Sequence, residues 1–204
     1  DLTWEKTTTI NAGIDFAFLN YRIGGSVDYY HKKGTDLLGR VTLDPTNGFP
    51  DAQMNFASML NQGVEVTLNT TPLVINDFRW NLGFNISYNK NEVTKVEAAG
   101  SSVPDYLEGA PGFGNGVAIV GKPLGRLYSY RYAGLDEQGQ VMLWQGNEKV
   151  HYSAFDKNIE NLKYEGTLEA PWYGGVNTSF EYKGITLSAN ATYKFGHKFR
   201  LPVG

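Results

Sequence analysis

The clearest pattern along the chain is a strict alternation of apolar and polar residues from Phe78 to about Lys90. The segment reads FRWNLGFNISYNK, with the large apolar residues at every second position. Because successive side chains of a β-strand point to opposite faces, this segment has one apolar face and one polar face. It therefore predicts a strand that separates an apolar environment from a polar one.

Five more stretches show the same period of two, which gives predicted strands at about 7–18, 23–32, 61–70, 78–90, 172–182 and 185–195. Short connections near Asn20, Asn76 and Gly184 join these strands in pairs. Longer stretches rich in turn-forming residues, at about 33–60 and 91–171, separate the pairs. Paired alternating segments with short polar links predict antiparallel hairpins. We therefore predict an all-β antiparallel up-and-down meander.

The order of the connections and the placement of charge favour a transmembrane β-barrel. Outer-membrane barrels have short turns on the periplasmic side and long loops outside, and their strands alternate between lipid and a watery lumen. Six charged residues of the alternating stretches lie on the polar register: Asp15, Asp28, Glu65, Arg79, Glu181 and Lys194. Aromatic residues gather at both ends of the apolar register, as they do at the two interfaces of a bilayer. Residues 1–204 are thus predicted to form part of one β-barrel domain, with long extracellular loops.

A soluble protein with one dry sheet face is the alternative explanation of the same pattern. A β-sandwich or a lipocalin-like barrel also alternates apolar and polar residues. In the soluble alternative, a carbohydrate-binding β-sandwich that uses the aromatic residues of its loops, Phe84, Ile86, Leu187 and Tyr193 would be buried against a second sheet. In a membrane barrel, they would face outward, away from any protein.

Composition narrows the function classes further. The chain has 204 residues, a net charge of −3 and no cysteine. No run of about 18 apolar residues is present, which excludes a helical membrane protein. No basic block suggests nucleic-acid binding. Because Asp1 is not followed by a charged and then an apolar leader region, we expect a mature piece or an internal segment of an exported protein.

The sequence offers no catalytic or metal-binding constellation. His31, His151 and His197 are far apart and have no ligand spacing between them. No nucleophile-elbow motif occurs, and Asp136–Gly139 reads as a turn because it lacks the ligand pattern of a calcium loop. We therefore expect neither an enzyme nor a cofactor-binding protein.

Aromatic residues of the longer irregular stretch are the candidate ligand contacts. Rings held among glycines and prolines are available to stack on sugars or to grip peptides. The alternative for each ring is that it packs the loop onto itself. The four residues that we expect to meet substrate are Tyr106, Phe113, Tyr128 and Trp144.

Several segments contain sequence motifs that resemble those of one known family. They begin with Trp4–Thr7 and continue with Asn61–Val66 (NQGVEV), Trp80–Asn91 (WNLGFNISYNKN), Gly121–Tyr130 (GKPLGRLYSY) and Tyr173–Gly184 (YGGVNTSFEYKG). Taken in order, they resemble the C-terminal barrel of the SusC/RagA family of TonB-dependent outer-membrane transporters. This resemblance implies a Gram-negative outer membrane of the Bacteroidetes type, contact with its lipid, and import of an oligosaccharide or a peptide. It also implies a SusD-like surface lipoprotein as partner and energy from TonB through an N-terminal part.

The resemblance also indicates what the chain lacks. The plug domain of the family lies N-terminal to the matching segments, and transporter barrels of this kind have about 22 strands. Six strands in a bilayer would leave two edges of unpaired backbone groups, which is costly in lipid. The remaining alternative of a different class is an adhesin-like structural barrel without a transport role.

Overall fold

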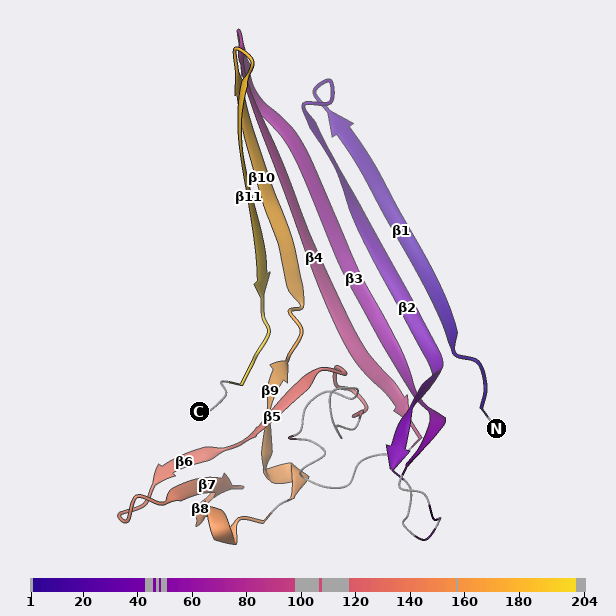
Figure 1. Cartoon of the computed structure of the whole chain (residues 1–204), viewed down its shortest axis with the longest axis vertical. Coiled ribbons are helices and arrows are strands. Elements are labelled where there is room, and N and C mark those ends of the chain that lie inside the picture. Colours follow the sequence, from indigo (N-terminus) through magenta and orange to yellow (C-terminus); the bar gives the residue numbers. More distant parts are fainter. Residues whose placement is uncertain are drawn as a thin grey trace.

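A single six-stranded antiparallel sheet dominates the structure. The computed structural model describes residues 2–42, 46, 48, 51–97, 107, 118–156 and 158–200. Its strands follow the order β1 (Lys6–Phe18), β2 (Ile23–Thr42), β3 (Asp51–Ile75), β4 (Phe78–Val96), β10 (Trp172–Tyr182) and β11 (Ile185–Phe195). These strands lie side by side as a tilted wall with β1 and β11 at its two edges (Figure 1). The predicted all-β up-and-down meander is confirmed, and within the described residues it is an open segment of a barrel.

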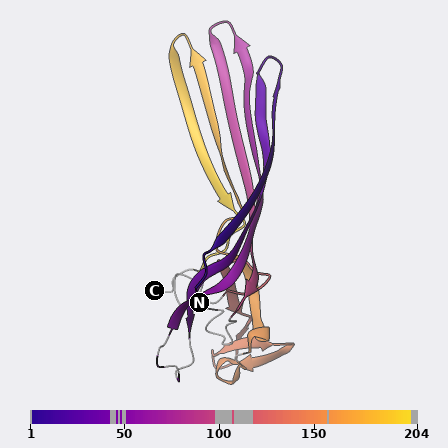
Figure 2. The ribbon, with the colours of Figure 1, turned by 90° about the vertical axis from the view of Figure 1, so that its right-hand side faces the viewer.

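The three predicted hairpins are present. β1 and β2 are joined at residues 19–22, β3 and β4 at 76–77, and β10 and β11 at 183–184. The last two turns have two residues each, with a positive φ of 52° at Asn76 and of 84° at Gly184, as tight hairpin turns require. All three turns lie at one end of the sheet, which we call the short-turn end, and the opposite end is called the loop end (Figure 2).

The strand register gathers the apolar residues on one face of the sheet, across all six strands. One row of directly opposed residues runs Phe16, Gly25, Leu68, Phe84, Val176 and Ala191. This face is open rather than buried: Ile14 is 71% exposed and Leu187 is 68% exposed. Within the described residues, no other sheet makes extensive contact with it. The soluble sandwich, which requires Phe84, Ile86 and Leu187 to be covered by a second sheet, is therefore not favoured.

Aromatic rings on the apolar face gather at two heights. Towards the loop end, Tyr88 lies 4.6 Å from Trp172 between ring centroids, and Trp172 stacks at 6.1 Å on Phe195. Towards the short-turn end, Phe180 stacks on Trp80 at 5.9 Å and on Phe78 at 6.4 Å. The two aromatic levels predicted at the ends of the apolar register are thus present.

The opposite face carries the polar and charged residues. A row of this face runs Asp15, Ser26, Thr67, Asn85, Gly175 and Thr192. Asp28 stands directly opposite Glu65, and Arg79 directly opposite Glu181. The predicted placement of these charges on the polar register is confirmed. Among the described helical segments, none has the length and apolar character needed to cross a bilayer.

Two strands are longer than the sequence predicts. The predicted strand at 23–32 continues to Thr42, and the one at 61–70 begins at Asp51 and ends at Ile75. The predicted loop at 33–60 is therefore much shorter. Bulges explain the difference: the pairing of β2 with β3 shifts between Gly34 and Leu37 and again between Leu37 and Leu38, and Asp36 has a φ of 57°. A bulge inserts one residue, which moves later side chains to the other face and destroys the period-two signal.

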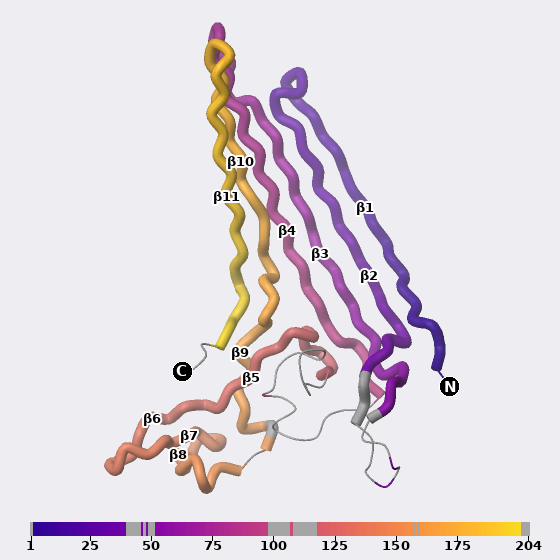
Figure 3. Tube along the Cα trace, viewed as in Figure 1, coloured from indigo at the N-terminus to yellow at the C-terminus, as the bar shows by residue number. Residues whose placement is uncertain are grey.

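The predicted loop at 91–171 also needs correction, because much of it is folded. β4 runs on to Val96, and five short strands follow: β5 (Arg126–Tyr130), β6 (Tyr132–Leu135), β7 (Val141–Gln145), β8 (Glu148–His151) and β9 (Leu162–Thr167). β5 pairs with β9, and β6, β7 and β8 form a second small sheet. These two sheets form a lobe at the loop end (Figure 3). Strands of four to six residues are too short to show a clear alternation.

Buried apolar residues lie at the loop end, in the lobe and at the loop ends of β3 and β4, where Ala57 and Val93 are buried. Leu127, Tyr128, Leu143, Phe155 and Leu162 belong to the lobe, and each is at most 8% exposed. The buried apolar residues thus lie where the sequence predicts loops, whereas apolar residues of the six predicted strands, such as Ile14 and Leu187, stay exposed.

Candidate ligand-binding site

The lobe has a small aromatic core between β5 and β9. Tyr128 and Leu162 are each 8% exposed and pack with Leu107, Ile119 and Tyr130. The rings of Tyr128 and its cross-strand partner Tyr164 lie 5.4 Å apart. This core joins β5 to β9 and gives the lobe its shape.

Of the four residues that the sequence proposed as ligand contacts, the structure describes two. Tyr106 and Phe113 lie outside the described residues. Tyr128 belongs to the β5–β9 core, whereas Trp144 is half-buried on β7, with the Lys149 ammonium 5.2 Å from the ring centroid. Tyr128 and Trp144 are therefore on different sheets, and a role of these rings in binding stays a prediction.

Two other rings of the lobe are better exposed. Tyr132 is 61% exposed at the start of β6, and Tyr152 is 51% exposed just after β8. Tyr152 packs edge-on against Tyr130, which in turn packs edge-on against the buried Phe155. Sequence reasoning did not single out Tyr132 and Tyr152 because the exposure of a ring in a loop depends on which neighbours cover it.

A polar edge accompanies the aromatic core. The Lys122 ammonium lies 4.3 Å from the centroid of the half-exposed Tyr164 ring, in cation–π geometry. On the other face, the Ser129 hydroxyl donates a hydrogen bond of 2.8 Å to Glu165. This bond, together with one from the Lys163 ammonium, lowers the pKa of the Glu165 carboxyl. The lobe therefore presents rings, ammonium groups and an ionised carboxylate, which suits a polar ligand that also has apolar faces.

Backbone pairing fixes the start of the lobe to β4. The Gly121 N–H donates to the Val93 carbonyl at 2.8 Å, and the Val93 N–H donates to the Lys122 carbonyl at 2.9 Å. The Asn91 side chain links this segment to the wall, because it accepts a 2.8 Å hydrogen bond from the Leu124 N–H and donates a 2.7 Å bond to the Asn61 amide oxygen. The entry into the lobe is therefore a continuation of the sheet.

The end of the lobe is fixed in a similar way. The Leu168 N–H donates to the Gly125 carbonyl at 2.7 Å, and the Lys198 N–H donates to the Thr167 carbonyl at 2.8 Å. The Arg200 guanidinium donates to the Tyr128 carbonyl. Lys198 and Arg200, which follow β11, thus connect the chain after the long sheet to both β9 and β5 of the lobe.

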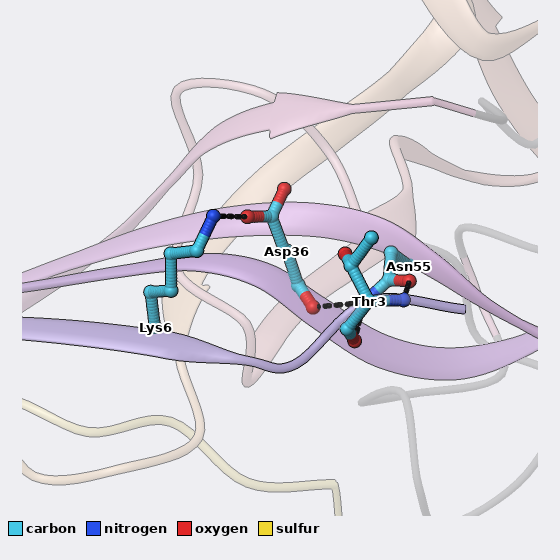
Figure 4. A network of polar contacts seen from close by, with 4 residues as sticks. All are labelled: Thr3, Lys6, Asp36 and Asn55. Carbon is cyan, nitrogen blue, oxygen red and sulfur yellow. Dashed lines mark hydrogen bonds and ion pairs between the residues drawn. The ribbon is translucent and has the colours of Figure 1, made fainter. Parts of the chain in front are cut away.

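A further polar network secures the N-terminal residues at the loop end (Figure 4). The Thr3 N–H donates to the Asn55 amide oxygen at 2.7 Å, and the Asn55 amide nitrogen donates to the Thr3 carbonyl at 2.9 Å. Asn55 also donates to the carbonyl of Asp36 in the bulge, and the Lys6 ammonium lies 3.5 Å from the Asp36 carboxylate. Asn55 on β3 thus contacts both the bulge in β2 and the segment before β1.

The polar face of the sheet forms shallow hollows near the short-turn end. One, of about 250 Å³, is lined by small and amide residues that include Gly24, Asn69, Asn81, Gly83 and Asn177. The Asn81 amide joins β4 to the neighbouring strands, since it accepts from the Thr71 hydroxyl at 3.0 Å and donates to the Ser179 hydroxyl at 3.3 Å. These groups can hydrogen-bond to water or to a polar solute that passes along this face.

Comparison with known proteins shows which family the six-stranded sheet and its lobe resemble. The whole chain, residues 1–204, matches the family model described as TonB dependent receptor-like, beta-barrel. It is 40% identical over 199 residues to the TonB-dependent receptor SusC of Bacteroides thetaiotaomicron, covering 92% of this chain and 19% of that protein. It is 32% identical over 177 residues to a TonB-dependent receptor of Formosa agariphila, covering 86% of this chain and 16% of that protein.

Solved structures show the same architecture. The RagAB peptide transporter superposes with a TM-score of 0.78 at 27% identity, covering 95% of this chain and 21% of the matched chain. The RagAB peptide importer in its closed-closed state gives a TM-score of 0.79 at 25% identity, covering 97% and 22%. The chain thus spans about a fifth of the length of the proteins that it matches.

Proposed function

Because the chain belongs to the TonB-dependent receptor-like β-barrel family, we propose that it forms part of the wall and outer loops of an energised nutrient importer in the outer membrane of a Gram-negative bacterium. In this proposal, the apolar face of the six-stranded sheet meets lipid and the polar face lines the lumen. The short-turn end lies in the periplasm, and the lobe lies outside the cell. The exposed apolar face is the observation that carries this proposal.

The height of the apolar face agrees with the thickness of a bilayer. On β4 it runs from Phe78 to Tyr88, which is about 34 Å along a strand at about 3.4 Å per residue. A tilt of about 40° reduces this to about 26 Å, close to the apolar band of about 25 Å on outer-membrane barrels. Aromatic rings mark both limits of this height, which is where amphipathic rings lie at bilayer interfaces.

Substrate and partners follow from the family and from the lobe. We propose a peptide or an oligosaccharide as cargo, because the lobe combines exposed rings with charged groups. The two matched solved structures are described as a peptide transporter and a peptide importer, which supports the peptide alternative. We further propose a SusD-like lipoprotein at the loop end, and TonB as the source of energy through parts of the protein beyond this chain. No observation favours the adhesin-like alternative.

The membrane placement is tested with single cysteines, since the chain has none of its own. Ile86→Cys and the neighbouring Asn85→Cys are placed in the complete protein, spin-labelled and reconstituted in outer-membrane lipid. We expect the label at position 86 to be accessible to oxygen and protected from a water-soluble nickel chelate, whereas the label at position 85 is less accessible to oxygen. Equal oxygen accessibility at the two positions would overturn the lipid-facing assignment.

The import function is tested by deletion of the gene. The deletion strain and a complemented strain are grown on a peptide mixture and on an oligosaccharide mixture, each as sole nutrient source. We expect a growth defect on one of the two mixtures that the intact gene restores. Normal growth of the deletion strain on both would contradict a role in the uptake of either class.

A further inference from the structure

The outward face of the sheet changes character just above the aromatic level at the loop end. That level is a row formed by Ala12, Tyr29, Val64, Tyr88, Trp172 and Phe195. Two residues further along each strand, the same face carries His31, Gln62 and Lys90 as directly opposed partners. The row after that contains Lys33, Leu60 and Glu92. The register therefore places two lysines on the outward face, immediately beyond the rings.

The two lysines differ in their partners within the protein. The Lys90 ammonium lies 2.6 Å from the Glu92 carboxylate, which is one row further out on the same strand. Lys33 is exposed, and within the described residues its ammonium makes no ion pair or hydrogen bond. An ammonium group has three N–H donors, and Lys90 therefore keeps donors for a second anion.

The height of these lysines suits the headgroup layer of a membrane. Lys90 lies two residues beyond the aromatic row, a rise of about 6.6 Å along the strand or about 5 Å along the membrane normal, and Lys33 lies four residues beyond it, or about 10 Å along the normal. A lysine on the outward face costs about 2 to 4 kcal/mol at mid-membrane but only about 0 to 1 kcal/mol near an interface. The outward lysines are thus placed where phosphate groups of lipid lie, and their aliphatic stems can cover the edge of the apolar band.

We propose that Lys33 and Lys90, with His31 and Gln62 between them, bind the phosphate groups of a phosphorylated glycolipid headgroup in the outer leaflet. This proposal rests on the membrane orientation proposed above, because the loop end must face outward. The two lysines stand on β2 and β4, separated by one strand and one row, so that their Cα atoms are about 12 Å apart. A headgroup with two phosphates on a disaccharide can span this separation, whereas a single phospholipid phosphate reaches only one ammonium at a time.

Lys33 supplies the net positive charge of this site, because Glu92 balances the charge of Lys90, whose remaining N–H donors can still bind phosphate. Hydrogen bonds between an ammonium and a phosphate are charge-assisted and are stronger than neutral ones. Water and salt screen an ammonium–phosphate interaction less at the edge of a low-dielectric layer than in free solution. The amide of Gln62 adds a neutral donor between the two cations on the same outward row as Lys90. The site thus provides donors over the width of three strands.

The chain provides a matched control for the test. Lys32 is next to Lys33 on β2, and it is also exposed, but it points to the opposite, polar face. Replacement of either lysine by glutamine removes the same charge at the same height. Only Lys33→Gln, Lys90→Gln and the double variant change the lipid-facing side.

The experiment measures glycolipid binding to the purified complete protein in non-ionic detergent by native mass spectrometry. The probes are diphosphorylated lipid A, its dephosphorylated form, and phosphatidylglycerol. We expect wild type and Lys32→Gln to retain diphosphorylated lipid A selectively, and each outward lysine variant to bind it about fivefold more weakly. Equal binding by the double variant and by wild type would overturn the proposal, and so would equal retention of the dephosphorylated form or of phosphatidylglycerol.

Folding and uptake are measured on the same variants, so that the two proposals are separated. A heat-modifiable mobility on gel electrophoresis reports an intact barrel, and growth on the transported nutrient reports import. Weakened lipid A binding by a folded variant that still imports supports the glycolipid site without bearing on the transport function. Loss of import by the gene deletion, with unchanged lipid A binding by every folded lysine variant, would overturn the glycolipid site alone.

Discussion

At the scale of single residues, pairs of a glycine and an aromatic ring connect neighbouring strands. Tyr193 lies directly opposite Gly174, and its hydroxyl donates a 2.8 Å hydrogen bond to the Asn85 carbonyl on the strand beyond. A Cβ atom at Gly174 would lie 2.6 Å from the Tyr193 hydroxyl oxygen, and it would also collide with the Asn85 carbonyl. The ring can therefore cross the glycine only because the position has no side chain.

This arrangement predicts that a methyl group at position 174 is harmful. Gly174→Ala should destabilise the protein by about 1 to 3 kcal/mol, because the ring and the Asn85 carbonyl must both move. Gly24→Ala serves as the control, since a Cβ atom there meets its nearest neighbour, the Phe16 carbonyl oxygen, at an ordinary 3.5 Å. The measurement is the urea midpoint of the refolded complete protein. A midpoint for Gly174→Ala that equals that of Gly24→Ala would show that the ring is not held over the glycine.

At the scale of elements, each long strand is defined by its two faces, and the faces differ in what they tolerate. Phe84 belongs to the open apolar row, and Asn85 belongs to the polar row. The two residues are adjacent on β4, which lies in the middle of the sheet. They therefore share the same depth and the same neighbouring strands, so that a substitution at one is matched by the same substitution at the other.

Arginine substitution at these two positions tests the faces directly. Phe84→Arg should impair membrane assembly, with a cost of about 2 to 4 kcal/mol for a cation facing mid-membrane lipid. Asn85→Arg should be tolerated, because its side chain points to the polar face. Folding yield is measured in a detergent or lipid refolding assay. Ile86→Arg and Leu187→Arg are added to the apolar-face variants, and Ser188→Arg is added to the polar-face variants. Similar yields from both sets would contradict the assignment of the faces.

The attachment of the lobe to β4 is also a property of elements. Asn91 joins β3, β4 and the segment that enters the lobe through two side-chain hydrogen bonds. Asn91→Ala should remove about 1 to 2 kcal/mol of local stability. Amide hydrogen exchange over residues 118–126 should consequently become about 5 to 30 times faster.

The control for this prediction is Asn85→Ala, on the same strand and the same face but without a side-chain partner among the described contacts. Both variants should keep the same urea midpoint for the barrel as a whole. Unchanged exchange in the Asn91→Ala variant would mean that backbone pairing through Val93 alone fixes the lobe.

At the scale of the whole molecule, the chain is organised with its apolar strand residues outside and its packed core at one end. The six long strands expose Ile14 and Leu187, whereas Tyr128 and Leu162 are buried in the lobe. A wall between lipid and a lumen needs no interior of its own, but a lobe in water does. Binding specificity is therefore expected in the lobe, where side chains are free of the constraints that a membrane imposes on strands.

This organisation predicts which rings matter for ligand binding. Alanine is placed singly at Tyr106, Phe113, Tyr128 and Trp144, and at the better exposed Tyr132 and Tyr152 in the complete protein. Loss of a ring that stacks on ligand should weaken binding by about 1 to 2 kcal/mol, or about 5- to 30-fold. Affinity is measured for the nutrient mixture that supports growth, together with surface expression. Normal affinity of all six variants at normal expression would show that these rings only pack the lobe.

The Tyr128→Ala variant differs from the others because it also affects the packing of the lobe. Because its ring belongs to the lobe core, its removal should also speed amide exchange across β5 and β9, whereas Trp144→Ala should leave that exchange unchanged. Weaker binding by Trp144→Ala with unchanged exchange therefore identifies a direct contact. Weaker binding by Tyr128→Ala alone, with faster exchange, identifies loss of the supporting core.

The sequence by itself determined the six strands, their three hairpins and the polarity of their faces. Alternation is a local property: Phe78 to Tyr88 shows which side chains share a face without any knowledge of the neighbouring strands, and Asn76 and Gly184 mark turns through their own backbone preferences. The sequence motifs of the same segments also indicated the family, and the comparisons confirm it.

Only the tertiary structure decided where the strands end and how the loop between β4 and β10 folds. The bulge at Asp36 breaks the alternation, and the continuation of β2 and β3 beyond it depends on pairing between residues distant in the sequence. The dipeptide Gly146–Asn147 is typical of a two-residue hairpin turn, and it could have predicted the β7–β8 hairpin from the sequence. Which rings are buried was not encoded locally, because Tyr128 and Tyr132 differ in exposure through contacts with Leu162 and Tyr164, which lie more than thirty residues further along the chain.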